Sequence, residues 1–234
     1  MKHRILLIAG SIVALAGCPD DDDDNNTAAV IDTTSRFSVR VSNLTVDQPM
    51  SPLAIMTHNG EFALFEVGGS ASIELEHLAE AGSNAELMAL MDSDSNIDHA
   101  VSGNGLLLPG NSDSVELTID GDFNYLSIAT MLVNTNDAFV GETGISVADL
   151  EVGESYQMNM NVWDAGTEAN DELAATIPGP AGGGEGFNAE RNDDDRVTFH
   201  SGVISQDDGL ATSALNAQHR FLNPGARLTI TRLE

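Results

Sequence analysis

The sequence predicts one mainly β domain over residues 36–234, an antiparallel β-sandwich with two short helices. Short segments in which apolar and polar residues alternate recur through this region, and clusters of turn residues separate them. Alternation with a period of two residues is typical of strands that bury one face, as in a sandwich. Two further segments have apolar residues at helical spacing. The region is long enough to bury a hydrophobic core.

The first predicted strand shows the alternating pattern most clearly. In residues 36–44, the apolar side chains of Phe37, Val39 and Val41 alternate with polar ones. Later segments repeat this period or form a longer apolar run, and turn residues bound each of them. The predicted strands are therefore residues 36–44, 114–120, 123–133, 156–162, 196–205 and 226–233.

Two segments between these strands have helical spacing instead. Residues 71–82 place apolar side chains on one helical face and end at Gly82, a typical stop residue. Residues 84–93 repeat the apolar spacing, so we expect two short helices beside the sandwich. Residues 177–186, IPGPAGGGEG, are rich in Gly and Pro and are predicted to be a loop.

The N-terminus has the features of an export signal. A basic start, MKHR, precedes an 11-residue apolar run that is too short to span a bilayer. Residues 15–18, LAGC, resemble the lipobox of bacterial lipoproteins, in which cleavage leaves an acylated cysteine at the new N-terminus. We therefore predict a signal peptide over residues 1–17 and lipidation of Cys18, the only cysteine in the sequence. The alternative is an ordinary export signal, with Cys18 incidental.

Residues 18–35 are predicted to form an acidic, disordered tether. They include five consecutive aspartates, and a block of like charge stays solvated. Loss of Lys2 and Arg4 with the signal leaves 7 basic residues against 37 acidic ones, a formal charge of −30. Nucleic acid is then a poor partner because it requires a basic face. Such acidity suits divalent cations, or salty surroundings that screen the repulsion.

The sequence carries no recognisable catalytic motif. It contains no GxSxG nucleophile elbow and no HExxH zinc motif, and its histidines are scattered without ligand spacing. Residues 92–99, DSDSNIDH, begin like a calcium-binding EF-hand loop. Ile97 and Gly103 stand where that loop requires glycine and glutamate, so a polar connection is the better interpretation. We predict that the protein is not an enzyme.

Two carboxylates follow the fourth predicted strand at close spacing. The segment WDAGTE places Asp164 and Glu168 on either side of Gly166. Calcium prefers roughly six to eight oxygen ligands, which carboxylates on loops at one end of a sandwich supply. Asp137, in NTNDAFVG after the third predicted strand, is the third candidate ligand. From the residues themselves, a calcium site and a pair of exposed turns both explain the pattern.

Several segments resemble the spondin N-terminal domain, found in the animal matrix proteins F-spondin and mindin and in many bacterial secreted proteins. VWDAGTEANDE and MLVNTNDAFVG carry the resemblance most strongly. FSVRVSNLT, PLAIMTHNGEFALFEVG, EHLAEAG, TIPGPAGGGEG, VTFHSGVIS and PGARLTITR support it. Together these segments span nearly all of residues 36–233.

The resemblance implies a β-sandwich similar to calcium-dependent lipid-binding domains, with a calcium ion held by loops at one end. The ligand positions of the family match Asp137, Asp164 and Glu168. Animal members usually have Trp where this chain has Ala138, and aspartate where it has Glu168, so the geometry of ligation is expected to differ. The partners of the animal proteins do not carry over.

These observations predict a calcium-binding lipoprotein of the bacterial cell envelope, in the periplasm or at the outer membrane or cell surface. Cys18 is expected to anchor it to the membrane. The expected role is adhesion to, or recognition of, an unidentified protein or glycan. Two alternatives stay open, a purely structural envelope protein with a structural metal site and, less favoured, a metal-dependent hydrolase.

Overall fold

The computed structural model describes residues 34–234. The predicted signal peptide, Cys18 and all but the last two residues of the predicted tether lie outside the described residues. Within residues 34–234, no helix is both long and apolar enough to cross a membrane.

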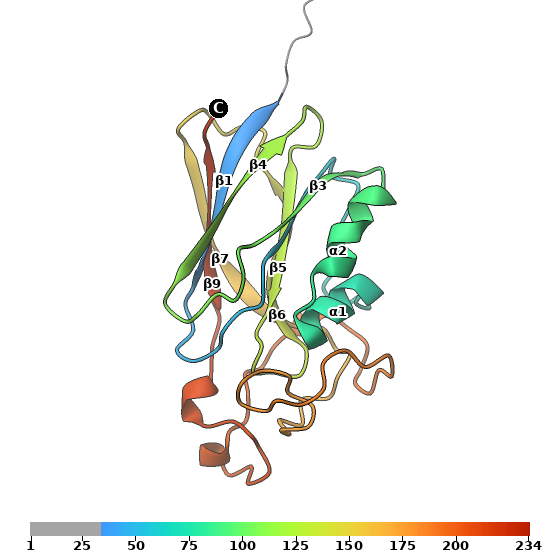
Figure 1. The fold of residues 1–234 in the computed structure, drawn as a ribbon, viewed down its shortest axis with the longest axis vertical. Helices are drawn as coiled ribbons and strands as arrows, with labels where there is room; N and C mark the ends of the chain where they lie inside the picture. The colour runs from blue at the N-terminus through green and yellow to red at the C-terminus, as the bar shows by residue number, and fades with distance from the viewer. Residues whose placement is uncertain (1–33) are drawn as a thin grey trace, which may run out of the picture. The chain divides into compact units, whose positions relative to one another are not determined.

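The described part of the chain is mainly β, with every strand pair antiparallel (Figure 1). The neighbours along the sheet follow the order β3-β2-β5-β6-β7-β9-β1-β4, and β8 pairs with β7 outside this path. The strands are β1 (Ser35–Asn43), β2 (Ala54–His58), β3 (Ile97–Ser102), β4 (Ser112–Ile119), β5 (Tyr125–Met131), β6 (Ala138–Ser146), β7 (Ser155–Asp164), β8 (Thr198–Phe199) and β9 (Ala226–Arg232).

Strand β7 belongs to both layers of the sandwich. Its residues 155–160 pair with β9, in the layer that also contains β1 and β4. Its last residues, 161–164, pair with β6, in the layer that contains β5, β2 and β3. The predicted antiparallel sandwich is therefore confirmed, and its two layers are joined through one strand.

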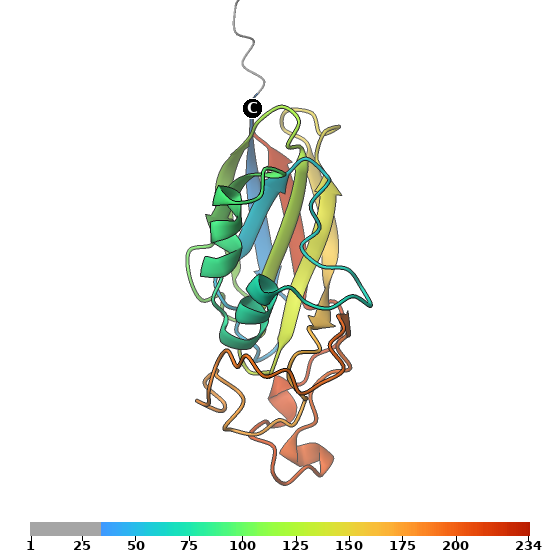
Figure 2. The ribbon, with the colours of Figure 1, turned by 90° about the vertical axis from the view of Figure 1, so that its right-hand side faces the viewer.

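The helices lie on the outer face of the β2-β5-β6 layer, as Figure 2 shows. They are α1 (Ile73–Ala81) and α2 (Ala85–Ala89), and a short 3₁₀ turn, η1 (Leu90–Asp92), extends α2. The Ser72 side chain caps α1 by accepting the Leu75 amide, and Gly82 ends it in the left-handed region, with φ of 66°. Both predicted helices are confirmed, and α1 ends at the predicted stop residue.

Two hydrophobic cores hold these layers together. The larger core lies between the sheets and the smaller one lies under the helices, so β2 and β5 are buried on both faces. The first core includes Val39, Ile55, Ile128, Val140 and Leu228. The second includes Met56, Leu75, Leu78, Ala129 and Phe139.

The prediction of a strand over residues 196–205 is wrong for most of that segment. Only Thr198–Phe199 is strand, pairing with the end of β7. Gly202 then adopts a φ of 90° and its amide donates to Nδ1 of His200, so the chain turns away from the sheet edge. Three strands were not predicted at all: β2, β3 and β6.

Most of the irregular chain gathers at one end of the sandwich (Figures 1 and 2). Residues 165–197 and 200–225 form it, and we call this end the loop end; it contains the 3₁₀ turns η2 (Gln206–Asp208) and η3 (Ala217–His219). Strand β1 begins at the opposite end, where the Arg36 amide donates to the carbonyl of Glu234. The described chain therefore starts and finishes at the end away from these loops.

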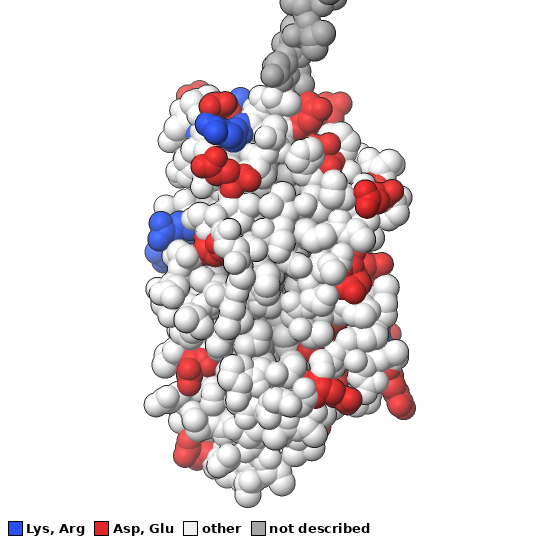
Figure 3. All heavy atoms as spheres, in the orientation of Figure 1, with Lys and Arg blue, Asp and Glu red and all other residues white. Residues whose placement is uncertain are grey.

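On one face of the molecule, acidic side chains are scattered and do not form one continuous patch (Figure 3). On the face shown in Figure 3, Asp and Glu appear in many separate places and Arg in few. This matches a formal charge of −28 for the whole sequence. The exposed Arg36 pairs with Glu116 and Glu234, a kind of surface pair that contributes little to stability.

Candidate metal centre

Strand pairing brings the two predicted acidic connections together at the loop end. Asp137 directly precedes β6 and Asp164 is the last residue of β7. Ala138 and Asp164 are register partners, and the Ala165 amide donates to the Asp137 carbonyl at 3.3 Å. The sequence predicted this proximity from the positions of the two acids after strands.

The turn after β7 folds onto the Asp137 carboxylate. Oδ2 of Asp137 accepts the backbone amides of Thr167 at 2.8 Å and Glu168 at 3.1 Å, and also the Thr167 hydroxyl at 3.2 Å. Gly166 has a φ of 71° and packs against the backbone of Arg196, where a side chain would collide. This is the physical reason for a glycine between Asp164 and Glu168.

Buried carboxylate oxygens at this turn lack hydrogen-bond partners. Asp137 is fully buried and Glu168 is 3% exposed. Within the described residues, Oδ1 of Asp137, Oε2 of Glu168 and Oδ1 of Asn136 have no hydrogen-bond partner. Buried polar atoms are rarely left in this state, so a hydrogen-bond donor, a water molecule or a cation is expected at each of these acceptors.

The electrostatics of the turn point the same way. Burial raises the pKa of Asp137 to about 7, and the negative charge of Asp164 adds to this effect. Burial, together with the negative charges of Glu80 and Asp137, raises the pKa of Glu168 to about 8. Both carboxyl groups are therefore partly protonated near neutral pH, unless a bound positive charge takes the place of the proton.

Asp164 has a different environment from the other two acids. Its Oδ1 accepts the Gly166 amide at 2.8 Å, and its Oδ2 accepts the Asn170 side-chain amide at 2.6 Å. Nε2 of His200 lies 4.0 Å from Oδ2 of Asp164, and burial lowers the pKa of this histidine. The negative charge of Asp164 acts on Asp137, and that of Asp137 acts on Glu168. Asp137 thus lies between two acidic neighbours.

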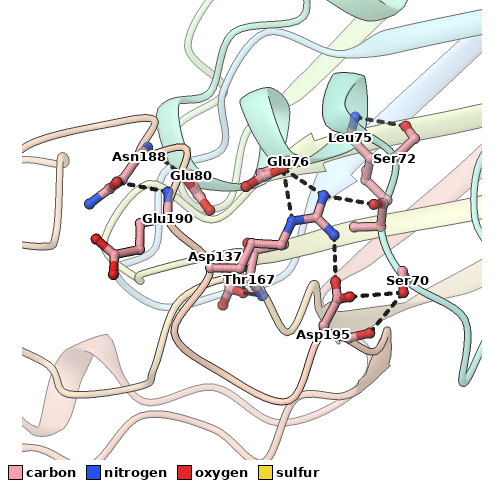
Figure 4. A network of polar contacts seen from close by, with 12 residues as sticks. Ser70, Ser72, Leu75, Glu76, Glu80, Asp137, Thr167, Asn188, Glu190 and Asp195 are labelled. Carbon is pink, nitrogen blue, oxygen red and sulfur yellow. Dashed lines mark hydrogen bonds and ion pairs between the residues drawn. The ribbon is translucent and has the colours of Figure 1, made fainter.

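A fourth carboxylate approaches from helix α1. Glu80 is fully buried; its Oε2 accepts the Asn188 amide at 2.8 Å, as Figure 4 shows, and its Oε1 has no partner among the described residues. Arg191 does not fill this role, because its guanidinium donates to Oε2 of Glu76 at 2.6 and 3.0 Å and also binds Asp195.

The residues present fit a hard cation in chemistry, although the side chains have not closed around one point. In residues 34–234, no three His, Cys, Asp or Glu side chains already form a group that holds a metal ion. The unpaired oxygens nevertheless belong to carboxylates and an amide, which are the ligands that calcium prefers. Ion binding at this turn would therefore involve rotation of the acidic side chains.

A family model described as Spondin_N matches residues 44–176, more than half of the chain. The chain belongs to the spondin N-terminal domain family. The match includes α1, α2 and all strands from β2 to β7, and it contains Asp137, Asp164 and Glu168. No curated protein matches the chain. In this spondin domain, β1 and β9 lie outside the matched region and complete the second layer of the sandwich.

We call Asp137, Asp164, Glu168 and the polar residues around them the acidic centre. Sequence reasoning missed three of its residues, Asn136, Glu80 and His200. Asn136 is adjacent to a predicted ligand, whereas Glu80 and His200 are far from it in sequence. The histidines were expected to have structural or surface positions, and His200 is buried beside Asp164. For Glu80 a sequence feature was available: it follows Glu76 by four residues, a repulsive spacing on one helix face.

The loop end also carries an exposed apolar groove, separate from the acidic centre. Its volume is about 540 Å³, and Leu44, Val46, Phe221 and Leu222 contribute to its lining. Val46 is 73% exposed and Leu222 is 84% exposed. Leu44, Val46 and Leu222 are accessible at the surface, whereas Phe221 is buried.

Proposed function

We propose that this spondin domain binds one calcium ion at the loop end, through Asp137, Asp164 and Glu168, and acts in adhesion or recognition at the bacterial cell envelope. The observation that carries the proposal is the pair of buried, unpartnered oxygens on Asp137 and Glu168. Calcium would supply the positive charge that neutralises these carboxylates. The turn that holds them would then be fixed to the start of β6.

The burial of the acids favours an indirect role for the ion. Asp137 and Glu168 are almost inaccessible to solvent, so an ion between them would have little contact with a large partner. The ion would instead set the shape of the surrounding loops, and recognition of a protein or glycan would fall to their outer surface. The same burial favours a second candidate, a structural envelope protein in which the ion only stabilises the loops.

A binding role is better supported than a catalytic one. The His200 side chain is fully buried and its Nε2 contacts the side chain of Asn170 at 3.0 Å. A general base must reach the proton that it removes, and a buried histidine does not reach a substrate. Hydrolase activity is therefore the least favoured of the three functions.

The position of the loops suits display at a surface. Strand β1 begins at the end of the sandwich opposite the loop end. A lipid anchor at Cys18 would precede this strand in the chain. The anchor and the localisation in the envelope remain part of the proposal.

Calcium titration by calorimetry tests the metal site. The wild-type protein is expected to bind one calcium ion at this site, and an Asp164→Asn, Glu168→Gln variant is expected to lose that binding. Melting with chelator and with millimolar calcium provides a second readout, because a ligand that binds the folded state raises its stability. An equal melting temperature under both conditions would contradict the proposal.

A matched control is available in the loop that resembles an EF-hand. Asp92→Asn with Asp94→Asn neutralises two acids outside the proposed centre and is expected to leave calcium binding unchanged. A pull-down or glycan array with and without calcium then separates the two binding roles. Partners that appear only with calcium support recognition, and their absence favours the structural role.

A further inference from the structure

The geometry points to Glu80 of helix α1 as an additional ligand of the same cation, so that the ion joins the helix layer to the loop end. This inference rests on the proposed calcium site and extends it to a part of the chain more than fifty residues earlier than Asp137. Its consequence is structural coupling between α1 and the turn after β7. The ligand class is a hard divalent cation with oxygen coordination.

The first support is the state of the Glu80 carboxylate. Glu80 is fully buried, on the same face of α1 as Glu76, which lies four residues earlier. One of its oxygens accepts the Asn188 amide, and Oε1 has no partner within residues 34–234. A glutamate on a short helix usually extends into water, so this unpaired, buried oxygen requires an explanation.

The second support is the position of this carboxylate beside the proposed ligands. Among the charges around Glu168, that of Glu80 has the largest effect. The Thr167 hydroxyl interacts with Glu80 and also lies 3.2 Å from Oδ2 of Asp137. Figure 4 shows Glu80 on α1 with Asp137 and Thr167 at the loops below it. Thr167 therefore interacts with both Glu80 and Asp137, and each of these carboxylates has one unpaired oxygen within the described residues.

The third support is that the nearby basic group is already engaged. Arg191 is the cation whose charge acts on Glu80. Its guanidinium is bound to Glu76, to Asp195 and to the carbonyl of Ala71 at 2.8 Å. Arg191 thus neutralises Glu76 and does not form an ion pair with Glu80. A bound metal ion would supply the missing positive charge.

The composition of the cluster favours calcium over magnesium. Calcium accepts many carboxylate and carbonyl oxygens in flexible geometry, whereas magnesium demands a compact octahedron and keeps several waters. Glu80 and Glu168 have long side chains on separate elements, and Asn136 adds an unpaired amide oxygen beside them. Two long side chains from separate elements can adjust around a large ion more easily than around a small one.

A calcium titration of Glu80→Gln tests the inference. Glutamine keeps the size of the side chain and an oxygen for the Asn188 amide, and removes the charge. We expect at least a tenfold weaker calcium affinity than in the wild type. The control is Glu172→Gln, which neutralises another buried glutamate of the loop end whose carboxylate accepts the Ile204 amide instead. It is expected to bind calcium as the wild type does.

The outcomes separate this inference from the function on which it rests. If the wild type binds calcium and Glu80→Gln binds it as tightly as Glu172→Gln does, Glu80 is not a ligand and the metal site itself stands. If the wild type binds no calcium, the proposed function fails and the inference fails with it. Hydrogen exchange of the wild type provides evidence without a variant: calcium should slow exchange in residues 73–81, and unchanged exchange there would overturn the role of Glu80.

Discussion

At the loop end, individual acidic side chains are buried without a basic side chain among the described residues that pairs with them. Glu172 is a clear case outside the proposed metal centre. Its Oε1 accepts the Ile204 amide at 3.0 Å and its carbonyl accepts the Ala214 amide at 2.8 Å, so it joins three loop segments. Burial raises its pKa from 4.5 to about 7. This residue therefore connects the pH of the solution to the stability of the loop end.

The Glu172→Gln variant should change the pH dependence of stability. The folded state keeps the Glu172 proton up to about pH 7, whereas the unfolded chain releases it near pH 4.5, so this residue lowers stability as pH rises between these values. We expect the variant to resemble the wild type near the lower pH and to exceed it by about 1–3 kcal/mol above the upper one. Urea unfolding across this range measures the difference, and a difference independent of pH would contradict the assignment.

At the scale of elements, burial decided which strands the sequence revealed. Strands β1 and β4 bury one face and expose the other, and their alternating sequences predicted them. Strand β2 is buried at all five positions because it lies between the two cores, and it has no alternation to detect. Strand β6 loses its alternation in the same way over Ala138–Gly141, where all four residues are buried.

The residues of the acidic centre also differ in how well the sequence predicts them. Asp137 and Asp164 were predictable because each stands where a strand begins or ends, and neighbouring strands place such residues together. Glu80 was harder to predict, because an acidic residue on a helix is normally solvated and its repulsive spacing from Glu76 does not by itself indicate burial. Its burial depends on the Asn188 amide, which lies 108 residues further along the chain. Only the three-dimensional structure brings these two segments together.

Arg191 fastens the loop of residues 188–196 to helix α1, and its removal should destabilise the fold. The Glu76 side chain is 1% exposed and relies on Arg191 for its neutralisation. Arg191→Ala would leave a buried, uncompensated carboxylate at a cost of about 3–5 kcal/mol. Urea unfolding is the measurement. Arg220→Ala is the control, because its pair with Asp208 is exposed and should contribute little. Equal effects of the two variants would contradict the role of Arg191.

At the scale of the whole molecule, the excess of negative charge sets the response to salt. The sequence has 37 acidic and 9 basic residues, and acidic side chains are scattered over the face of the described part that Figure 3 shows. Like charges at these distances repel one another, and salt screens that repulsion. We therefore expect the fold to be more stable at high salt concentration than at low salt concentration.

Sodium chloride should therefore raise the melting temperature at neutral pH. We expect a rise of a few degrees between low and molar salt, because a stability gain of about 1 kcal/mol moves the midpoint by about 2–4 °C for a chain of this size. Calorimetric scans measure it, and the rise should shrink near pH 4, where many carboxylates are protonated. A melting temperature that is flat or falling with added salt would contradict this prediction.

The placement of the chain ends has a mechanical consequence. Strand β1 starts at one end of the sandwich and the loop end lies at the other, so a pull between the two ends would run lengthwise along β1. The hydrogen bonds of β1 to β4 and to β9 would then be loaded in shear, many at once, rather than peeled apart singly. A domain pulled in this direction is therefore expected to resist tension better than one whose strands separate one hydrogen bond at a time.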